Sequence, residues 1–261
     1  MLRGGISSVS YRNARAQDII TAAHNAGLGG IEWSADTHAP HGETERAEEL
    51  MIATLRAGLT VSAYGSFYRM GPSTHQTLDF SESVLSCARR LQAPIIRVWA
   101  TDIPGTPLEA LTQEAKRLAD EAGRYGITIC LEPHELSAIS DYNRLAELVE
   151  MAAHPFFKAC WAPLSSPGRT NSEEGITLLA PHIALIHVRN WTKSYARRPL
   201  GENLDCWTRV VDALAERARR SVLDHWALIE YLENESQETL NRETEALRAL
   251  LAERSLAAEL K

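Results

Sequence analysis

Three polar side chains able to carry out chemistry stand late in separate apolar runs of this sequence. Glu132 lies in LEPH, His187 in IHVRNW and Glu230 in IEYLE. Two carboxylates and an imidazole can bind Mn²⁺, Mg²⁺, Co²⁺ or Zn²⁺. The residue types therefore predict a divalent metal site with mixed oxygen and nitrogen ligands.

Further polar and aromatic residues close or follow the apolar runs, and these are the candidates for contact with a substrate. They are Glu32, His38, Arg69, Trp99, His134 and Arg189. Arg69 and Arg189, together with Lys193, could neutralise a carboxylate or phosphate group on the substrate. Two alternatives remain open, because Glu32 and Arg97 could form a purely structural ion pair and Trp99 could simply fill the core.

Short β-rich runs alternate with longer helical patterns along the chain, which is typical of βαβ units and a parallel sheet. We expect strands at Gly5–Ser10, Gly30–Ser34, Thr60–Gly65, Pro94–Ala100, Thr128–Glu132, Lys158–Trp161, Ala184–Arg189 and Ala227–Leu232. We expect helices at Ala16–Ala26, Glu43–Ala57, Thr77–Leu91, Leu108–Tyr125, Asp141–Ala153, Ser172–Leu179, Asp205–Arg220 and Ser236–Arg254. Eight units in 261 residues predict a single α/β domain, residues 1–261, folded as a (β/α)₈ TIM barrel.

Glycines mark the corners between the expected elements. Gly27, Gly58 and Gly126 each follow a helical pattern and precede a strand pattern, as a left-handed residue after a helix C-terminus would. An open doubly wound sheet is the alternative architecture. No GxGxxG follows the first strand run, and the eighth unit exceeds what most such sheets contain, so both features favour the closed barrel.

The alternation of side chains along a strand predicts which of these residues face the barrel interior. Cys130 and Glu132 share one parity in the fifth run, as do His187 and Arg189 in the seventh, and Glu230 has the equivalent parity in the eighth. We therefore expect Glu132, His187 and Glu230 to meet at the C-terminal mouth, where barrel enzymes place their active sites. A glutamate that donates and accepts protons near neutral pH would need a raised pKa.

The ordered set of motifs GIEW, DTH, YGSFYR, IRVWA, LEPH, IHVRNW and IEYLE resembles the xylose-isomerase-like barrel family over essentially the whole chain. That family includes ketose epimerases, hydroxypyruvate isomerase, inosose dehydratase and, more remotely, the endonuclease IV group. The resemblance implies a sugar isomerase or epimerase that acts on a small polyhydroxy carbonyl compound. It also implies that Glu132 and Glu230 face each other across the substrate and exchange the proton.

The resemblance further implies a metal site built from a glutamate, an aspartate, a histidine and a glutamate on the last four strands. Glu132, His187 and Glu230 occupy three of these positions. In the sixth run, KACWAPL, the aspartate position falls on Ala162, or on Trp161 if the register slips by one, and neither side chain can bind a metal. We therefore expect weak binding of a divalent ion, unless His134 supplies the missing ligand.

Composition argues against nucleic acid and membranes as partners. A formal net charge of −7 repels a polyanion, and no stretch approaches the length of uncharged apolar sequence that spans a bilayer. The start of the chain lacks the apolar core of a signal peptide, and the four cysteines show no CxxC spacing. These features predict a cytoplasmic protein with a small sugar or polyol as its ligand, as a monomer or a homo-oligomer.

Three other functions remain open. A dehydratase or lyase of the same family would share the catalytic base and differ in the leaving group. A phosphodiesterase of the endonuclease branch would require many more histidine and aspartate ligands than this chain offers. The third alternative is a sugar-binding or regulatory barrel that lost catalysis together with its sixth-strand carboxylate.

Overall fold

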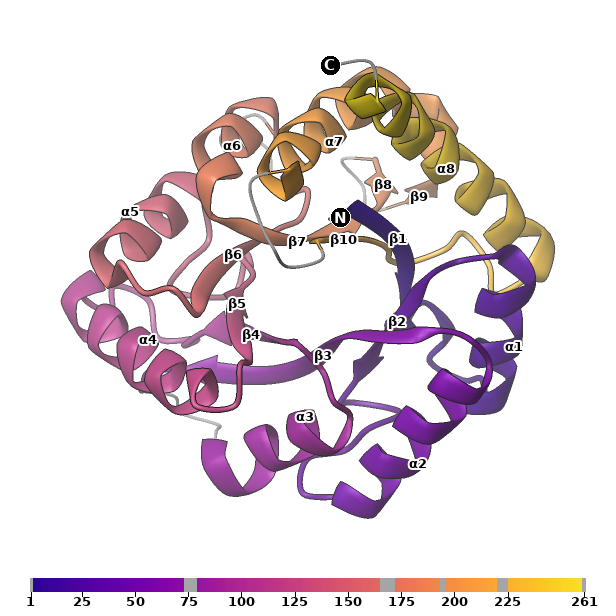
Figure 1. The fold of residues 1–261 in the computed structure, drawn as a ribbon. Helices are drawn as coiled ribbons and strands as arrows, with labels where there is room; N and C mark the ends of the chain where they lie inside the picture. The colour runs from indigo at the N-terminus through magenta and orange to yellow at the C-terminus, as the bar shows by residue number, and fades with distance from the viewer. Residues whose placement is uncertain (1, 73–78, 165–171, 193–195, 220–224, 260–261) are drawn as a thin grey trace.

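Eight parallel strands hydrogen-bond in a closed ring, and helices surround that ring (Figure 1). The computed structural model describes residues 2–72, 79–164, 172–192, 196–219 and 225–259. The barrel strands are β1 (Leu2–Ser7), β2 (Gly30–Ser34), β3 (Thr60–Met70), β4 (Ile95–Ala100), β5 (Thr128–Leu131), β6 (Phe157–Trp161), β7 (Ile183–Val188) and β10 (His225–Ile229). Each strand pairs with its neighbours in sequence order, and β10 closes the ring against β1. This arrangement is a (β/α)₈ TIM barrel, which confirms the predicted fold class.

The helices form the outer layer, and α8 lies between α7 and α1 to cover the closing strands (Figure 1). Their bounds are α1 (Ala16–Ala26), α2 (Thr44–Arg56), α3 (Ser86–Arg90), α4 (Leu108–Gly123), α5 (Tyr142–Ala152), α6 (Ser172–Leu179), α7 (Leu204–Arg219) and α8 (Gln237–Glu259). Short elements fill the connections: η1 (Ser8–Tyr11), η2 (Phe80–Leu85), η3 (Ala180–His182), η4 (Leu200–Asn203) and the hairpin of β8 (Asn190–Trp191) with β9 (Arg197–Arg198). No helix in the described ranges is both long and apolar enough to cross a membrane.

Each predicted strand overlaps a strand of the barrel, but the first strand is offset and β3 continues to Met70, five residues beyond its expected end. The first strand begins and ends three residues earlier than expected, because Ser8–Tyr11 forms a 3₁₀ turn instead of continuing the strand. Gly27, Gly58 and Gly126 have φ angles of 67°, 74° and 70°, so the predicted left-handed corners are confirmed. The third predicted helix is interrupted, since a π-helical turn at Phe80–Leu85 precedes the short α3.

Two separate clusters of buried residues show which way the strand side chains point. One includes Cys130, Cys160, Leu185 and Leu228, which share the predicted inward parity and fill the interior of the barrel. The other joins the opposite parity of the strands, such as Ile129, to the helices. The predicted alternation is therefore confirmed, and it determines which side chains can reach the mouth of the barrel.

Trp161 on β6 belongs to the outer cluster and is fully buried between two helices. Its ring lies 6.3 Å from that of Tyr142 on α5, in a stacked arrangement, and 5.6 Å from that of Trp207 on α7 at an interplanar angle of 88°. We expect Trp161→Ala to lower the free energy of unfolding by about 3–5 kcal/mol, because it leaves a cavity between β6 and the helices. Urea unfolding measures the loss, and Leu55→Ala, at a 49% exposed side chain of α2, should change stability by less than about 1 kcal/mol.

Candidate active site

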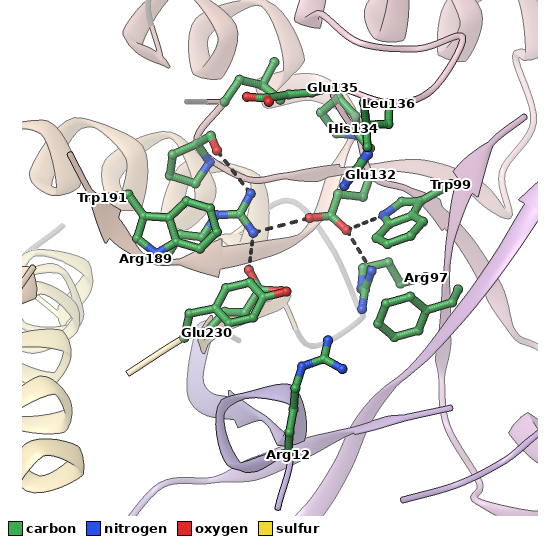
Figure 2. A pocket seen from close by; sticks show the side chains of 15 residues that line it. Arg12, Arg97, Trp99, Glu132, His134, Glu135, Leu136, Arg189, Trp191 and Glu230 are labelled. Carbon is green, nitrogen blue, oxygen red and sulfur yellow. Dashed lines mark hydrogen bonds and ion pairs between the residues drawn. The ribbon is translucent and has the colours of Figure 1, made fainter. Parts of the chain in front are cut away.

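A cavity of about 460 Å³ opens at the mouth of the barrel, within the range of roughly 300–1,000 Å³ that is usual for small-molecule sites. Its lining comes from residues at or just after the C-terminal ends of β4, β5, β6, β7 and β10, together with Phe67 of β3 and Arg12 of the β1–α1 connection. The cavity therefore lies where parallel barrels hold their active sites. Figure 2 shows its side chains, with Glu132, Glu230 and Arg189 at the centre.

Glu132, His187 and Glu230 converge at the base of this cavity, as the sequence predicts. The Nδ1 atom of His187 lies 3.2 Å from Oε1 of Glu230 and 3.5 Å from Oε1 of Glu132. All three side chains are buried, and one ligand atom of each lies within 4.8 Å of the others. They come from the ends of β5, β7 and β10, so ring closure is what brings residues distant in sequence together.

A buried ion-pair chain supports Glu132 from below. Nε of Arg97 donates to Oε1 of Glu32 at 2.7 Å, and Nη1 of Arg97 donates to Oε2 of Glu132 at 2.7 Å. The second carboxylate oxygen of Glu32 lies 2.8 Å from Nε2 of His187. Gly65 on β3 makes room for this chain, because a Cβ there would stand 2.7 Å from the Arg97 guanidinium and 2.9 Å from Glu32. Glu32 and Arg97 thus form the structural pair that the sequence left as an alternative.

Arg189 lies between the two catalytic candidates (Figure 2). Its Nη1 donates to Oε2 of Glu230 and lies 3.8 Å from Oε1 of Glu132. Its Nη2 donates to the carbonyl oxygen of Pro163 at 3.1 Å, and the guanidinium lies 4.8 Å from the centre of the Trp191 ring. A single guanidinium therefore bridges the ends of three barrel strands.

Aromatic side chains form the upper wall. Nε1 of Trp99 donates to Oε2 of Glu132 at 2.8 Å, and its ring packs against Phe67 and His134 with centroid distances of 4.9 and 4.4 Å. On the opposite side the rings of Trp191 and Tyr231 lie 5.2 Å apart. Such faces suit the C–H surface of a sugar, and the polar ring atoms remain available for hydrogen bonds.

Two of these aromatic residues adopt unusual backbone conformations. Phe67 has a φ of 55° and Tyr231 a φ of 60°, which side chains other than glycine rarely adopt. Phe67 lies where the pairing of β3 with β4 shifts register, between Gly65 and Arg69. Phe67, Tyr231 and Arg12 are not among the substrate contacts predicted from the sequence, although all three line the cavity. A positive φ reverses the direction of a side chain, so strand alternation carries no signal for these positions.

Three of the predicted substrate contacts, Glu32, His38 and Arg69, lie outside the lining of this cavity. Glu32 lies below it in the ion-pair chain. His38 is buried, and its ring nitrogens lie 3.2 Å from the Ser8 hydroxyl and 3.2 Å from the Ala14 carbonyl oxygen. Arg69 lies behind the wall, with its guanidinium 5.1 Å from the centre of the Trp99 ring. Trp99, His134 and Arg189 do line the cavity, and Lys193 lies outside the described residues.

Burial and nearby cations act in opposite directions on the two central carboxylates. Burial raises the pKa of Glu132, but Arg97, His187 and Arg189 outweigh it and hold that pKa well below its usual value. Burial also raises the pKa of Glu230, and His187 and Arg189 reverse that shift, so its pKa is lowered too. Neither glutamate therefore has the raised pKa that proton exchange near neutral pH would need. Both carboxylates are ionised at neutral pH and can accept a proton directly.

Burial and neighbouring charges also have opposite effects on the pKa values of His187 and Glu32, which lie below the cavity. Burial lowers the pKa of His187, but Glu230 and Glu32 outweigh it and raise that pKa well above its usual value. Burial raises the pKa of Glu32, and Arg97 and His187 overcome it to give a pKa of about 2. The buried carboxylates are thus matched by cations placed directly beside them, as charges removed from water require.

Glu132, His187 and Glu230 have the residue types of a divalent metal site, but no fourth ligand joins them among the residues that the structure describes. Trp161 points outward, so Ala162 has the inward parity, and its methyl group supplies no ligand. Nδ1 of His134 accepts a hydrogen bond from the backbone N–H of Leu136 at 3.1 Å, and His134 does not join the three. The Arg189 cation already donates to Oε2 of Glu230 and lies 3.8 Å from Oε1 of Glu132. This donor set fits a guanidinium better than a divalent metal.

Comparisons with known proteins agree with this architecture. L-ribulose 3-epimerase superposes with a TM-score of 0.73 at 16% identity, over 100% of this chain and 98% of that chain. The probable 3-DHS dehydratase AsbF from Bacillus anthracis superposes with a TM-score of 0.72 at 16% identity, over 95% and 99%. A xylose isomerase-like TIM barrel protein from Mycobacterium smegmatis in complex with magnesium gives 0.68 at 14% identity, over 97% of both chains.

This chain also covers 44% of a xylose isomerase-like TIM barrel/4-hydroxyphenylpyruvate dioxygenase fusion protein, with a TM-score of 0.76 and 14% identity over 99% of this chain. No curated protein matches the sequence significantly. The family model described as xylose isomerase-like TIM barrel matches residues 20–253. The closed ring of eight strands, the cavity at its C-terminal mouth and this match over most of the sequence lead to one conclusion: the chain belongs to the xylose isomerase-like TIM barrel family.

Proposed function

We propose that this protein is a sugar isomerase or epimerase that moves a proton at a carbon next to the carbonyl of a small polyhydroxy compound. The observation that carries the proposal is the pair of buried, ionised carboxylates, Glu132 and Glu230, on either side of one guanidinium in the cavity. Similarity to an L-ribulose 3-epimerase supports the same class of reaction. The proposal treats residues 1–261 as one barrel domain.

The reaction follows from the positions of these groups. A substrate carbonyl that accepts a hydrogen bond from Arg189 makes the neighbouring C–H more acidic, because positive charge next to the oxygen stabilises the enediolate. One carboxylate takes the proton, and the C–H electron pair moves into the enediolate. The other carboxylate takes up a proton from water and delivers it to the opposite face or to the adjacent carbon, and the first carboxylate releases its proton to water. Return to the opposite face is epimerisation, and return to the adjacent carbon is isomerisation.

The wall residues would orient the substrate for this step. Trp99 and Tyr231 offer ring faces to the C–H surface of a sugar, and Trp99 also fixes Glu132 through its Nε1 hydrogen bond. A base held by two hydrogen-bond donors, Arg97 and Trp99, cannot swing away from the carbon that it attacks, and such placement contributes strongly to rate.

Proton exchange into solvent tests the proposal. We expect the wild-type protein, incubated in D₂O with a panel of ketopentoses, ketohexoses and aldoses, to replace the hydrogen next to the carbonyl in at least one sugar and to form its isomer or epimer. Nuclear magnetic resonance detects both changes, and the Glu132→Gln/Glu230→Gln double variant should show neither. Sugar binding without exchange in the wild-type protein would contradict the proposal and favour a sugar-binding barrel.

A dehydratase is the second candidate, because AsbF is among the similar structures. It would use the same carboxylate to remove the proton, and then expel a hydroxyl group from the next carbon. The experiment above separates the two functions, since dehydration produces a conjugated carbonyl that absorbs in the ultraviolet and has lost one water.

A further inference from the structure

We propose that the Arg189 guanidinium is the resident cation of the Glu132–His187–Glu230 group and takes the position of a divalent metal ion, so that the protein works without one. The catalytic part of this inference rests on the proposed function. The part that concerns metal binding stands on the geometry alone.

Arg189 occupies the space that a metal ion would need. A metal ion bound by Glu132 and Glu230 would lie about 2.0–2.2 Å from an oxygen of each carboxylate. Nη1 of Arg189 already donates to Glu230 and lies 3.8 Å from Glu132, so it stands in the gap between these carboxylates (Figure 2). An arginine side chain cannot shed its proton to relieve the repulsion of a second cation. A metal ion and the Arg189 guanidinium therefore exclude each other.

Several contacts hold the Arg189 side chain in this position. Nη2 donates to the Pro163 carbonyl oxygen, and the guanidinium lies 4.8 Å from the Trp191 ring and 5.9 Å from the Tyr231 ring, both within reach of a cation–π interaction. Its side chain is only 12% exposed. The Pro163 carbonyl belongs to the segment after β6 where Ala162 leaves no carboxylate. Arg189 thus reaches the sixth strand through a backbone oxygen.

The charges of the side chains around the three ligands also disfavour a divalent ion. Three buried carboxylates, Glu32, Glu132 and Glu230, face two buried guanidiniums, Arg97 and Arg189. The charges of these five groups sum to one negative charge. A divalent ion would instead leave a net positive charge in a site removed from water, which is energetically costly. The two arginines therefore leave only one negative charge, which is too little to neutralise a divalent ion.

This assignment changes the chemistry expected of the site. A guanidinium activates a carbonyl as a hydrogen-bond donor of fixed geometry, whereas a metal ion does so as a Lewis acid. Arg189 directly follows the barrel strand β7, so its position relative to Glu132 and Glu230 is set by the barrel. The enediolate would be stabilised by the polypeptide itself.

Titration with MnCl₂ of four proteins tests the inference: the wild type, Ala162→Asp, Arg189→Met and the Arg189→Met/Ala162→Asp double variant. By calorimetry we expect no saturable binding to the wild type or to Ala162→Asp. Removal of Arg189 should expose the three ligands, and the double variant should bind Mn²⁺ at least about tenfold more tightly than Ala162→Asp. Thermal unfolding and circular dichroism confirm that each variant is folded.

Three outcomes would overturn the inference. These are stoichiometric tight binding of Mn²⁺ by the wild type, a gain in Ala162→Asp equal to that of the double variant, and no gain in a folded double variant. If the methionine variants do not fold, Arg189→Lys keeps a cation on the same strand and should still bind no Mn²⁺, whereas tight binding by that variant would contradict the inference.

A second readout separates this inference from the proposed function. Wild-type protein stripped with a chelator should turn over its sugar as fast as untreated protein, and added MnCl₂ should not raise the rate. Loss of turnover on chelation, restored by Mn²⁺, would overturn the inference but leave the isomerase or epimerase proposal intact. Absence of turnover with every sugar would overturn the proposed function, and the titration would still decide whether Arg189 excludes the metal.

Discussion

Glu132→Gln and Glu230→Gln should each lower kcat by roughly 10²–10⁴-fold with little change in KM, because the amide keeps the size of the side chain but cannot take a proton from carbon. The carboxylates act on opposite epimers in the proposed reaction. Each single variant should therefore still exchange the hydrogen of one epimer in D₂O, and the two variants should differ in which epimer that is. Steady-state kinetics and exchange followed by nuclear magnetic resonance measure the two effects.

The matched control is Glu147→Gln on the exposed face of α5, the helix that follows β5. It makes the same chemical change far from the cavity and should retain wild-type kinetics. Equal exchange of both epimers in both single variants would refute the two-base mechanism. A rise in KM without a fall in kcat would assign the two glutamates to binding alone.

Arg97→Met should lower the free energy of unfolding by about 3–5 kcal/mol at pH 7, because it leaves Glu32 and Glu132 buried without their shared partner. The matched control is Arg90→Met, which breaks an ion pair with Glu48 between side chains 58% and 47% exposed. That loss should stay below about 1 kcal/mol, since water already screens the charges. Chemical denaturation measures both values, and equal losses in the two variants would show that the buried chain is not a major source of stability.

The difference in unfolding free energy between the wild type and Arg97→Met should change with pH in a definite direction. Glu32 has a folded pKa of about 2, lower than its usual value of about 4.3, so its stabilising contribution is fully present above pH 4.3. The contribution is lost as the pH falls from about 4.3 toward 2. The stability gap between wild type and Arg97→Met should therefore narrow over that range, and a gap that stays constant would contradict the assigned pKa.

Strand alternation accounts for most of what the sequence predicted correctly. It identified the inward faces of β5, β7 and β10, and hence the meeting of Glu132, His187 and Glu230. Alternation gives the face of a strand but not the depth along the barrel axis. Glu32 therefore looked equivalent to Glu132, although it lies two residues before the end of β2 while Glu132 lies one residue after the end of β5.

Contacts across the ring were beyond the reach of sequence reasoning. The sequence predicted that Arg189 faces inward, but its bridge between Glu230 and Pro163 depends on ring closure and on the separation of three strands. The offset of β1 has a local cause, because Ser8–Tyr11 looks like strand but forms a 3₁₀ turn. Ser10 in that turn accepts a hydrogen bond from the backbone N–H of Tyr231, a contact between opposite ends of the sequence.

The backbone conformations of Phe67 and Tyr231 lower the stability of the folded protein at two positions that form its binding surface. A side chain other than glycine in the left-handed region costs about 1–3 kcal/mol, and both residues lie in the wall of the cavity. Glycine would relax the backbone at either position but would remove an aromatic ring from the wall. Substitutions to glycine that would stabilise the barrel would therefore also remove part of its binding surface. Selection for thermal stability alone would favour residues at these two positions that no longer form the cavity wall.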